Sequence, residues 1–453
     1  MELADIIATP AVWMVGALLV SLHAKHLPRR IASWVWLGYW GHLAAAVAQV
    51  ALTRSYFGGG DMFLYALQAG WLADAIAQNP ARLLPEVLAL AFQQEAHLPM
   101  QIIGAGSSTG SMSAIAGLLF LITGGSLYGA LTLVVTGAYL GKLVLYRALR
   151  ERMPGAERGL LFACLLLPSA VFWSAGLLKE SIAIGPLCVL VALLIRASGW
   201  LSKETFFAIA CAVPVALVKP YILVVLVVAA AVLLYLQRST RRGTVEVRPL
   251  YLALGSLLAL GGMVLLGRLF PEYAVDSLAE NLTRQQAVGQ IVTGGSTYSI
   301  ASGAEASPAG QLAFAPIAII TSLFRPFFFE IHNAASFVAA VEATLITTLA
   351  VRGLAKWGWR RLLGQVLNSP ILAFCVVFTL AFGLGVGLGT TNMGTLSRYR
   401  MPLMPFWATL LVVWNADIFE GKAVRRRSAS HAIAPVRSGA RRIRPPEEGN
   451  AET

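Results

Sequence analysis

Charged side chains are scarce in this 453-residue sequence: they make up 13% of it, where a soluble domain carries roughly a quarter. Hydrophobic residues make up 57%. Cysteine is scarce too, and the four residues present all lie in apolar stretches without metal-ligand spacing, namely Cys164, Cys188, Cys211 and Cys375. These shortages exclude an ordinary soluble globular protein, and they indicate neither a disulfide framework nor a zinc site.

Long apolar runs dominate the chain. A helix needs about 20 mostly apolar residues to cross a bilayer, and about eleven segments of this kind can be read from the sequence. Their positions are 5–23, 33–53, 127–147, 159–176, 181–197, 205–218, 220–236, 249–269, 335–352, 370–389 and 401–416. The first is expected to be retained, because Glu2 and Asp5 stand where a cleaved signal peptide carries basic residues. The sequence therefore predicts an all-α fold, a polytopic transmembrane helical bundle over residues 1–420.

Two apolar segments, 111–124 and 314–324, are too short to span and are expected to be interfacial or half-inserted helices. Two longer connections, 54–110 and 271–313, are predicted to be outer loops. In the first loop, apolar residues recur with helical spacing after Asp61, which predicts a helix lying along the membrane interface. The second loop has a length typical of lids and binding loops.

The basic residues fix the expected orientation. With the amino terminus outside, most of the 35 Lys and Arg residues fall in the inner loops and in the segment 421–453. That last segment lacks apolar periodicity and predicts a basic, disordered cytoplasmic tail, either a topology anchor or a contact for anionic lipid. The net charge of +13 is spread over these loops instead of forming one stripe, so no nucleic-acid partner is expected.

Charges at the ends of spans mark candidate functional sites, because a charge at the middle of a spanning helix costs about 2.5 kcal/mol or more. In the predicted orientation such charges collect in the outer turns, as Asp61, Lys179, Glu180, Lys219, Arg325, Glu330, Arg398 and Arg400. Two of these turns, 177–180 and 219–220, are only a few residues long and could be closed by neutral residues. The concentration of charge predicts a polar, cationic cavity at the outer face.

Each of these residues also has a purely structural interpretation. Asp61 could cap the helix that follows it. Lys179 and Glu180 could form a local ion pair, and Lys219 could extend its ammonium group to the interface. The two late arginines could be ordinary interfacial anchors. For two charges inside spans, Lys142 and Glu342, packing or helix pairing is expected.

Four short segments together carry a family resemblance. The first is GGGDMFLYALQAGWLA with Asp61 and Tyr65, and the second is a half-helix, a Gly-Ser break and a full span in SMSAIAGLLFLITGGSLYGALTLVVTGAYLGKLVLYRALR. The third is LLLPSAVFWSAGLLKES with Pro168, Trp173, Lys179 and Glu180, and the fourth is RYRMPLMPF with Arg398, Tyr399, Pro402 and Pro405. In these segments the chain resembles the C-type (GT-C) glycosyltransferase superfamily. Its members are multispanning enzymes that use polyprenyl-phosphate sugars, such as the protein mannosyltransferases and the lipid A aminoarabinose transferases.

The resemblance implies a reaction and a set of site residues. Asp61 would be the base that activates the acceptor, while cationic residues near the outer face would hold the lipid phosphate. Arg325, Arg398 and Arg400 are favoured over Lys179, because a guanidinium can bind two phosphate oxygens. Lys219, Glu330 and Tyr399 complete the expected substrate-binding set, and Glu180 joins Asp61 as a catalytic candidate. Many family members carry a second acid directly after the first, where this chain has Met62.

The expected partners are a polyprenyl-phosphate sugar, membrane lipid and a glycan, lipid or protein acceptor, at a bacterial inner membrane. No cofactor is required, although the carboxylates could hold a divalent metal. Two other classes stay open: a polysaccharide polymerase or ligase with arginine-centred outer loops, and a non-enzymatic transporter or flippase. A transporter should carry polar and helix-breaking residues in the middle of several spans. Here most spans are clean, which favours an enzyme.

Overall fold

The computed structural model describes residues 3–56, 58–199, 201–241 and 308–420, together with positions 261, 268, 297, 298 and 300. Within these residues every regular element is a helix, and one isolated bridge pairs Thr297 with Asn392. Most of the predicted span at 249–269, most of the predicted loop 271–313 and the predicted tail 421–453 lie outside the described residues. The all-α fold is confirmed for the part of the chain that is described.

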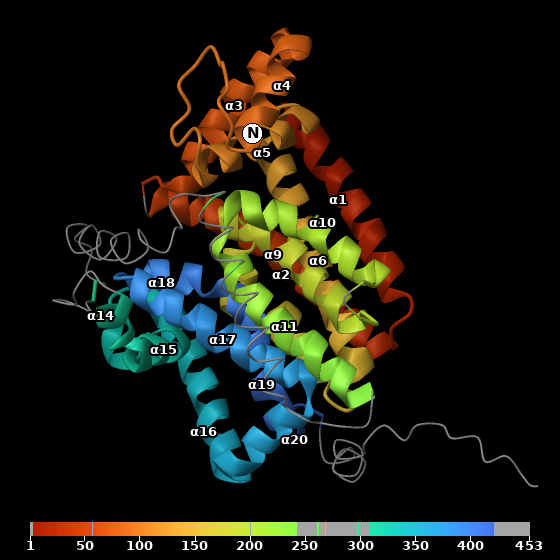
Figure 1. The fold of residues 1–453 in the computed structure, drawn as a ribbon. Helices are drawn as coiled ribbons and strands as arrows, with labels where there is room; N and C mark the ends of the chain where they lie inside the picture. The colour runs from red at the N-terminus through yellow and green to blue at the C-terminus, as the bar shows by residue number, and fades with distance from the viewer. Residues whose placement is uncertain are drawn as a thin grey trace, which may run out of the picture.

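The helices of the first half of the chain range from 5 to 27 residues in length. They are α1 (Leu3–Ala24), α2 (Arg29–Ser55), α3 (Asp61–Gln78), α4 (Pro80–Ala91), α5 (Ser108–Ile122), α6 (Leu127–Arg152), α7 (Glu157–Leu161), the π-helical turn η1 (Phe162–Leu166), α8 (Pro168–Trp173), α9 (Lys179–Arg196), α10 (Lys203–Val218) and α11 (Tyr221–Arg241). Figure 1 shows α3, α4 and α5 together at one end of the molecule. We call these three helices the cap.

The second half supplies the remaining helices. They are α14 (Pro308–Leu312), α15 (Ala315–Phe324), the 3-10 turn η3 (Phe328–Glu330), α16 (Ala334–Asn368), α17 (Pro370–Gly389), α18 (Met393–Tyr399), the 3-10 turn η4 (Met401–Leu403), α19 (Met404–Trp414) and α20 (Ala416–Glu420). The short apolar segments predicted near 111–124 and 314–324 form α5 and α15. Helix α16 bends at Gly358, whose φ of 69° lies in the left-handed region.

Six of the described helices are long and apolar enough to cross a membrane, so the chain is an integral membrane protein. These stretches are Ala4–Ala24, Arg29–Ser55, Leu127–Arg152, Tyr221–Ser239, Ser336–Asn368 and Pro370–Gly389. Each overlaps one of the predicted spans. The predicted span at 159–176 is instead divided among α7, η1 and α8, because Leu167 is extended and Pro168 starts a new helix. The segments at 181–197, 205–218 and 401–416 form helices of 18, 16 and 11 residues.

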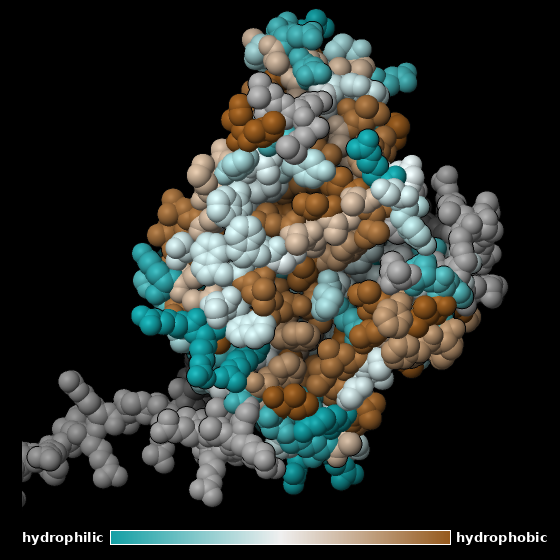
Figure 2. All heavy atoms as spheres, turned by 180° about the vertical axis from the view of Figure 1, so that it is seen from behind, coloured by the Kyte–Doolittle hydropathy of each residue, from teal (hydrophilic) through white to brown (hydrophobic). Residues whose placement is uncertain are grey.

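The surface agrees with a membrane location. Figure 2 shows hydrophobic residues over the middle of the molecule and hydrophilic residues mainly toward its two ends. Large apolar side chains that stay exposed include Met14 and Leu18 on α1 and Trp34 and Leu37 on α2. An apolar surface of this kind suits contact with lipid, since the backbone of each helix is satisfied internally.

The cap has a small hydrophobic core of its own. Leu72 and Ile76 from α3 meet Val87 and Leu90 from α4 and Ala114 from α5. The predicted helix after Asp61 is thus one of three packed helices in the loop 54–110. Two of them are capped by side chains, since Asn79 accepts from the backbone of Arg82 and Ser107 from that of Thr109.

Helix α9, which carries part of the candidate site, is packed closely against α6 through small residues. Helices α6 and α9 approach so closely at Gly141 and Gly185 that a Cβ atom on Gly141 would collide with the backbone of Gly185. Contacts between small residues of this type let membrane helices pack tightly. This packing fixes α9, which begins at Lys179 and Glu180.

Candidate functional site

Four charged side chains from distant parts of the chain meet in one chain of ion pairs, which we call the ionic cluster. Nη2 of Arg398 lies 2.8 Å from Oδ2 of Asp61, and Nε of the same residue lies 3.0 Å from Oε1 of Glu180. Nζ of Lys219 lies 2.6 Å from the same Oε1 atom. The cluster thus joins α3, α9, α18 and the junction of α10 with α11.

The ionic cluster runs from the protein interior to its surface. The side chain of Glu180 is 0% exposed, those of Lys219 and Arg398 are 5% and 17% exposed, and that of Asp61 is 49% exposed. Burial by itself would raise the pKa of the Glu180 carboxyl, but the charges of Lys219 and Arg398 outweigh burial and lower it to about 2. The cluster therefore ends in one accessible carboxylate, that of Asp61.

Aromatic side chains surround the cations of the cluster. Nζ of Lys219 lies 4.1 Å from the ring centroid of Tyr399 and 5.4 Å from that of Tyr221. Tyr65 is buried one turn after Asp61, and burial together with the Asp61 and Glu180 charges raises the pKa of its phenol well above the ordinary value. Tyr65 is therefore a neutral phenol at physiological pH.

The position of Asp61 follows from the three glycines before it. Gly58, Gly59 and Gly60 all have positive φ angles, 67°, 146° and 140°, which turn the chain sharply into α3. The cap position of α3 is Gly60, and no side chain caps the helix. Asp61 is the first helical residue, and its carboxylate binds Arg398 instead. The geometry therefore does not support a helix-capping role for Asp61.

Lys179 is close to the cluster in sequence but has different partners. Its Nζ donates to the hydroxyl of Ser108 over 3.0 Å and to that of Thr109 over 2.9 Å, at the amino-terminal end of α5. The ion-pair partners of Glu180 are Lys219 and Arg398, not its neighbour Lys179. Lys179 thus adds a positive charge at the amino-terminal end of α5, where the helix dipole also favours anions.

Arg325, Glu330 and Arg400 form a second group. Nε of Arg325 donates to both carboxylate oxygens of Glu330, over 2.8 and 3.1 Å, and the guanidinium lies 4.4 Å from the ring centroid of Tyr298. Arg400 is 0% exposed and donates through Nη1 to the backbone carbonyls of Ser322 and Arg325. The three arginines expected to bind phosphate are thus held by carboxylates or backbone, and Arg400 is sealed inside.

Glu342 and Lys142, the two charged residues expected to pair helices, each connect helices by hydrogen bonds. The carboxylate of Glu342 on α16 accepts from the backbone and the hydroxyl of Ser169 on α8, over 2.6 and 2.5 Å. Nζ of Lys142 on α6 meets Nε2 of His42 on α2 at 2.5 Å and Oγ of Ser174 at 2.7 Å. His42 and Ser174 were not singled out in the sequence, since each is one neutral polar residue in an apolar stretch.

The described residues do not fit a divalent metal. Among them, no three His, Cys, Asp or Glu side chains gather in a way that could hold an ion. The carboxylates of Asp61 and Glu180 are both paired with the guanidinium of Arg398.

The ionic cluster is the most specific chemical feature of the described chain, because it brings together Asp61, Glu180, Lys219, Arg398 and Tyr399 from the expected set of site residues. Comparisons with protein-family models, with curated proteins and with solved structures found no match to this chain.

Proposed function

We propose that this protein is a membrane glycosyltransferase that moves a sugar from a polyprenyl-phosphate donor to a glycan, lipid or protein acceptor, with Asp61 as the general base. One observation carries the proposal. The carboxylate of Asp61 is half exposed, and it is also held in place at 2.8 Å by an arginine that is itself anchored on a fully buried glutamate. A fixed, accessible carboxylate at the end of a membrane bundle meets the geometric need of a base.

In the proposed reaction, Asp61 accepts the proton of the acceptor hydroxyl or amine as the acceptor atom bonds to the anomeric carbon of the donor. The bond from that carbon to the lipid phosphate breaks, and its electron pair leaves with the phosphate oxygen. Attack from the side opposite the leaving group inverts the anomeric centre.

The other members of the cluster act through Asp61. Arg398 orients the carboxylate, and Glu180 orients Arg398 and Lys219, so we assign Glu180 as a positioning residue. The donor phosphate is assigned to the basic residues around the cap. Arg400 has no exposed surface, whereas Lys179, Arg325 and Arg398 are each partly exposed. We therefore assign the donor phosphate to Lys179, Arg325 and Arg398, and not to Arg400.

The decisive test is Asp61→Asn. The substitution keeps size and shape but removes proton acceptance, so we expect turnover to fall by roughly 10²-fold or more. Asp61 is half exposed, and Arg398 keeps its pair with Glu180, so the loss of stability should stay at about 1 kcal/mol. Transfer from polyprenyl-phosphate sugars would be measured in membranes, alongside the thermal midpoint of the purified variant.

Glu95→Gln is the matched control, because it removes an exposed acid from the same predicted loop without touching the cluster. We expect it to transfer sugar as the parent does. Full activity in Asp61→Asn, with expression and thermal midpoint unchanged, would leave the proposal without its base and would reject it.

The proposed topology has about eleven spans in a bacterial inner membrane, with the amino terminus and the cap outside and the segment after Glu420 in the cytoplasm. The distribution of Lys and Arg supports this orientation. A reporter fused after Thr453 is expected to be active only as a cytoplasmic reporter. Activity on the opposite side would place the cap, and with it the ionic cluster, at the wrong membrane face for a lipid-linked donor.

A further inference from the structure

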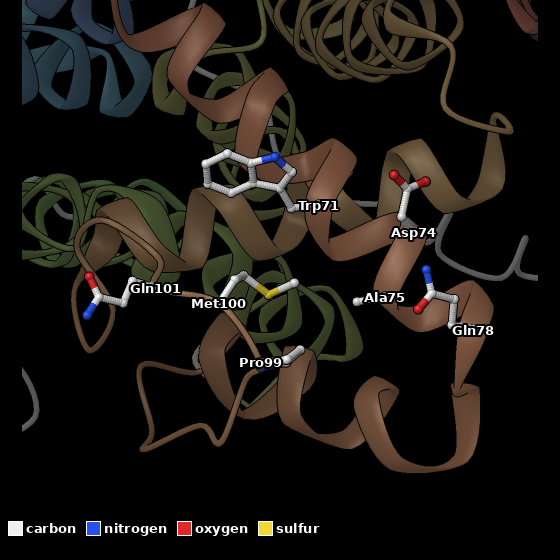
Figure 3. Close-up of a pocket in the computed structure, with 7 residues that line it drawn as sticks. All are labelled: Trp71, Asp74, Ala75, Gln78, Pro99, Met100 and Gln101. Atoms are coloured by element: carbon white, nitrogen blue, oxygen red, sulfur yellow. The ribbon is translucent and has the colours of Figure 1, made fainter.

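The cap carries an open depression on a different face of α3 from the one that holds Tyr65. Its volume is about 580 Å³. Helix α3 contributes one wall, and the connection between α4 and α5 contributes the other, so that the lining residues are Trp71, Asp74, Ala75, Gln78, Pro99, Met100 and Gln101. Figure 3 shows the indole of Trp71 above the side chain of Met100, with Asp74 and Gln78 next to each other on one side.

The polar groups of this depression are available to a ligand. Trp71 is 44% exposed, and Asp74 and Gln78 are exposed one turn apart on α3. Neither of these two polar side chains forms a hydrogen bond or an ion pair within the described part of the chain. An aromatic face beside a few convergent polar groups is the usual composition of a small-ligand site.

The charge of the lining selects the kind of ligand. Among the described residues that line it, Asp74 is the only charged one, and none is Lys or Arg. A phosphate or another anion would be repelled, so this depression does not compete with the cap's basic residues for the lipid phosphate. A neutral ligand rich in hydroxyl groups fits best, because a carboxylate accepts two hydrogen bonds and an amide both donates and accepts.

From this arrangement we infer that the depression binds a sugar ring. The apolar face of the ring, made of C–H groups, would lie on the indole of Trp71, while two neighbouring hydroxyls would bond to Asp74 and Gln78. The site is preorganised, since the opposite face of α3 is packed through Leu72 and Ile76 into the core of the cap.

The sugar site is separate from the ionic cluster. Asp74 follows Asp61 by thirteen residues on one helix, which corresponds to about 20 Å along its axis. The inference rests on the depression alone and holds whether or not the protein transfers sugars. Binding at this distance would hold the far part of a glycan or a glycolipid headgroup.

Direct binding tests the inference. The full-length protein would be purified in a polyoxyethylene detergent, because detergents with a maltoside headgroup would occupy the site. Saturation-transfer NMR would then measure the binding of neutral gluco-, manno- and galacto-configured trisaccharides. We expect at least one of them to bind, and Trp71→Ala to weaken that binding by about tenfold or more.

Two further variants separate a sugar site from other effects. Asp74→Asn should weaken binding by roughly three- to tenfold. The carboxylate can accept hydrogen bonds from two hydroxyls, whereas the amide accepts with its oxygen and donates with its nitrogen. Trp359→Ala removes another exposed indole, on α16 at a different part of the molecule, and should leave binding unchanged. The inference is overturned if no trisaccharide binds, or if Trp71→Ala and Asp74→Asn bind as the parent does.

A second experiment shows whether the bound sugar belongs to a glycolipid or to a glycan chain. The same headgroup is offered as a glycolipid in nanodiscs, where tighter binding than that of the free trisaccharide shows a glycolipid ligand and equal binding shows a glycan chain. Asp61→Asn should bind the trisaccharide normally. A failure of sugar transfer with normal binding therefore bears on the proposed function, and a failure of binding in the parent bears on this site.

Discussion

The ionic cluster and the buried group around Lys142 both place basic side chains among helices, yet they do so by opposite means. In the ionic cluster, Lys219 and Arg398 face the carboxylates of Glu180 and Asp61. Lys142 is 0% exposed, and its Nζ meets three neutral acceptors, on His42, Ser174 and the carbonyl of Ala170. In the ionic cluster, basic side chains are paired with carboxylates, whereas the amino group of Lys142 is satisfied by hydrogen bonds to neutral acceptors alone.

This difference indicates different roles. An ammonium group has three donors, and Lys142 has exactly one acceptor for each of them. His42 is oriented for this contact because its Nδ1 lies 2.6 Å from the carbonyl of Gly38, which leaves Nε2 as the acceptor. The group around Lys142 connects α2, α6 and α8 and extends no further. The ionic cluster ends instead in a carboxylate open to solvent, which a joint between helices does not need.

The largest expected effect comes from Glu180→Gln, which breaks the balance of the ionic cluster. It leaves Lys219 and most of Arg398 buried without their shared carboxylate, so we expect a loss of about 3–5 kcal/mol in the free energy of unfolding. Thermal or denaturant unfolding in detergent would measure it. The double variant Glu180→Gln, Lys219→Met should recover part of the loss, because one unpaired cation is removed, while Glu95→Gln should change stability by less than about 0.5 kcal/mol.

The same variant gives a pH signature. The folded-state pKa of Glu180 is about 2, below the ordinary value of 4.5, so its contribution is fully present above about pH 4.5 and is lost as pH falls toward 2. The stability gap between the parent and Glu180→Gln should therefore narrow over this range. A gap that stays constant down to pH 2 would contradict an ionised Glu180 in the folded protein.

A smaller loss in the free energy of unfolding is expected from Lys142→Met, which removes the amino group at the centre of the buried group. No charge is left unpaired, and the main cost is one unsatisfied acceptor on His42, or about 1–3 kcal/mol. Sugar transfer should persist at temperatures where the variant is folded. Lys25→Met, at an exposed position, serves as the control in both assays. Loss of function at intact stability would assign Lys142 a functional role inside the membrane and would favour a transporter over a transferase.

Much of the fold could be predicted because burial in lipid requires long apolar runs. The spans predicted at 5–23, 33–53 and 370–389 agree closely with helices α1, α2 and α17. Composition alone could not show that 159–176 is broken at Leu167 and Pro168, since a proline can start a helix as well as interrupt one. Helix α4 was missed as well, because it packs within the cap and not across the membrane.

The members of the candidate site could be predicted in part, but not their pairing. A full charge in a turn of a few residues, as at Glu180 or Lys219, is itself a signal. Which partner each charge meets depends on helices that are far apart in the sequence. Arg398 meets Asp61 and Glu180 and not Glu330, while Lys179 turns to the hydroxyls of α5. These choices follow from tertiary packing, for which the sequence has no local pattern.

The order of the cluster along the chain has a consequence for biosynthesis. Lys219 follows Glu180 by 39 residues, whereas Arg398 follows it by 218. At about 5–20 residues per second, a ribosome reaches Arg398 roughly 10–40 s after Glu180, but it reaches Lys219 within about 2–8 s. Lys219 is therefore the first cation available to neutralise Glu180 while the helices enter the bilayer. Asp61 acquires its arginine only when the last helices are made, so a truncated or stalled chain cannot hold a completed cluster.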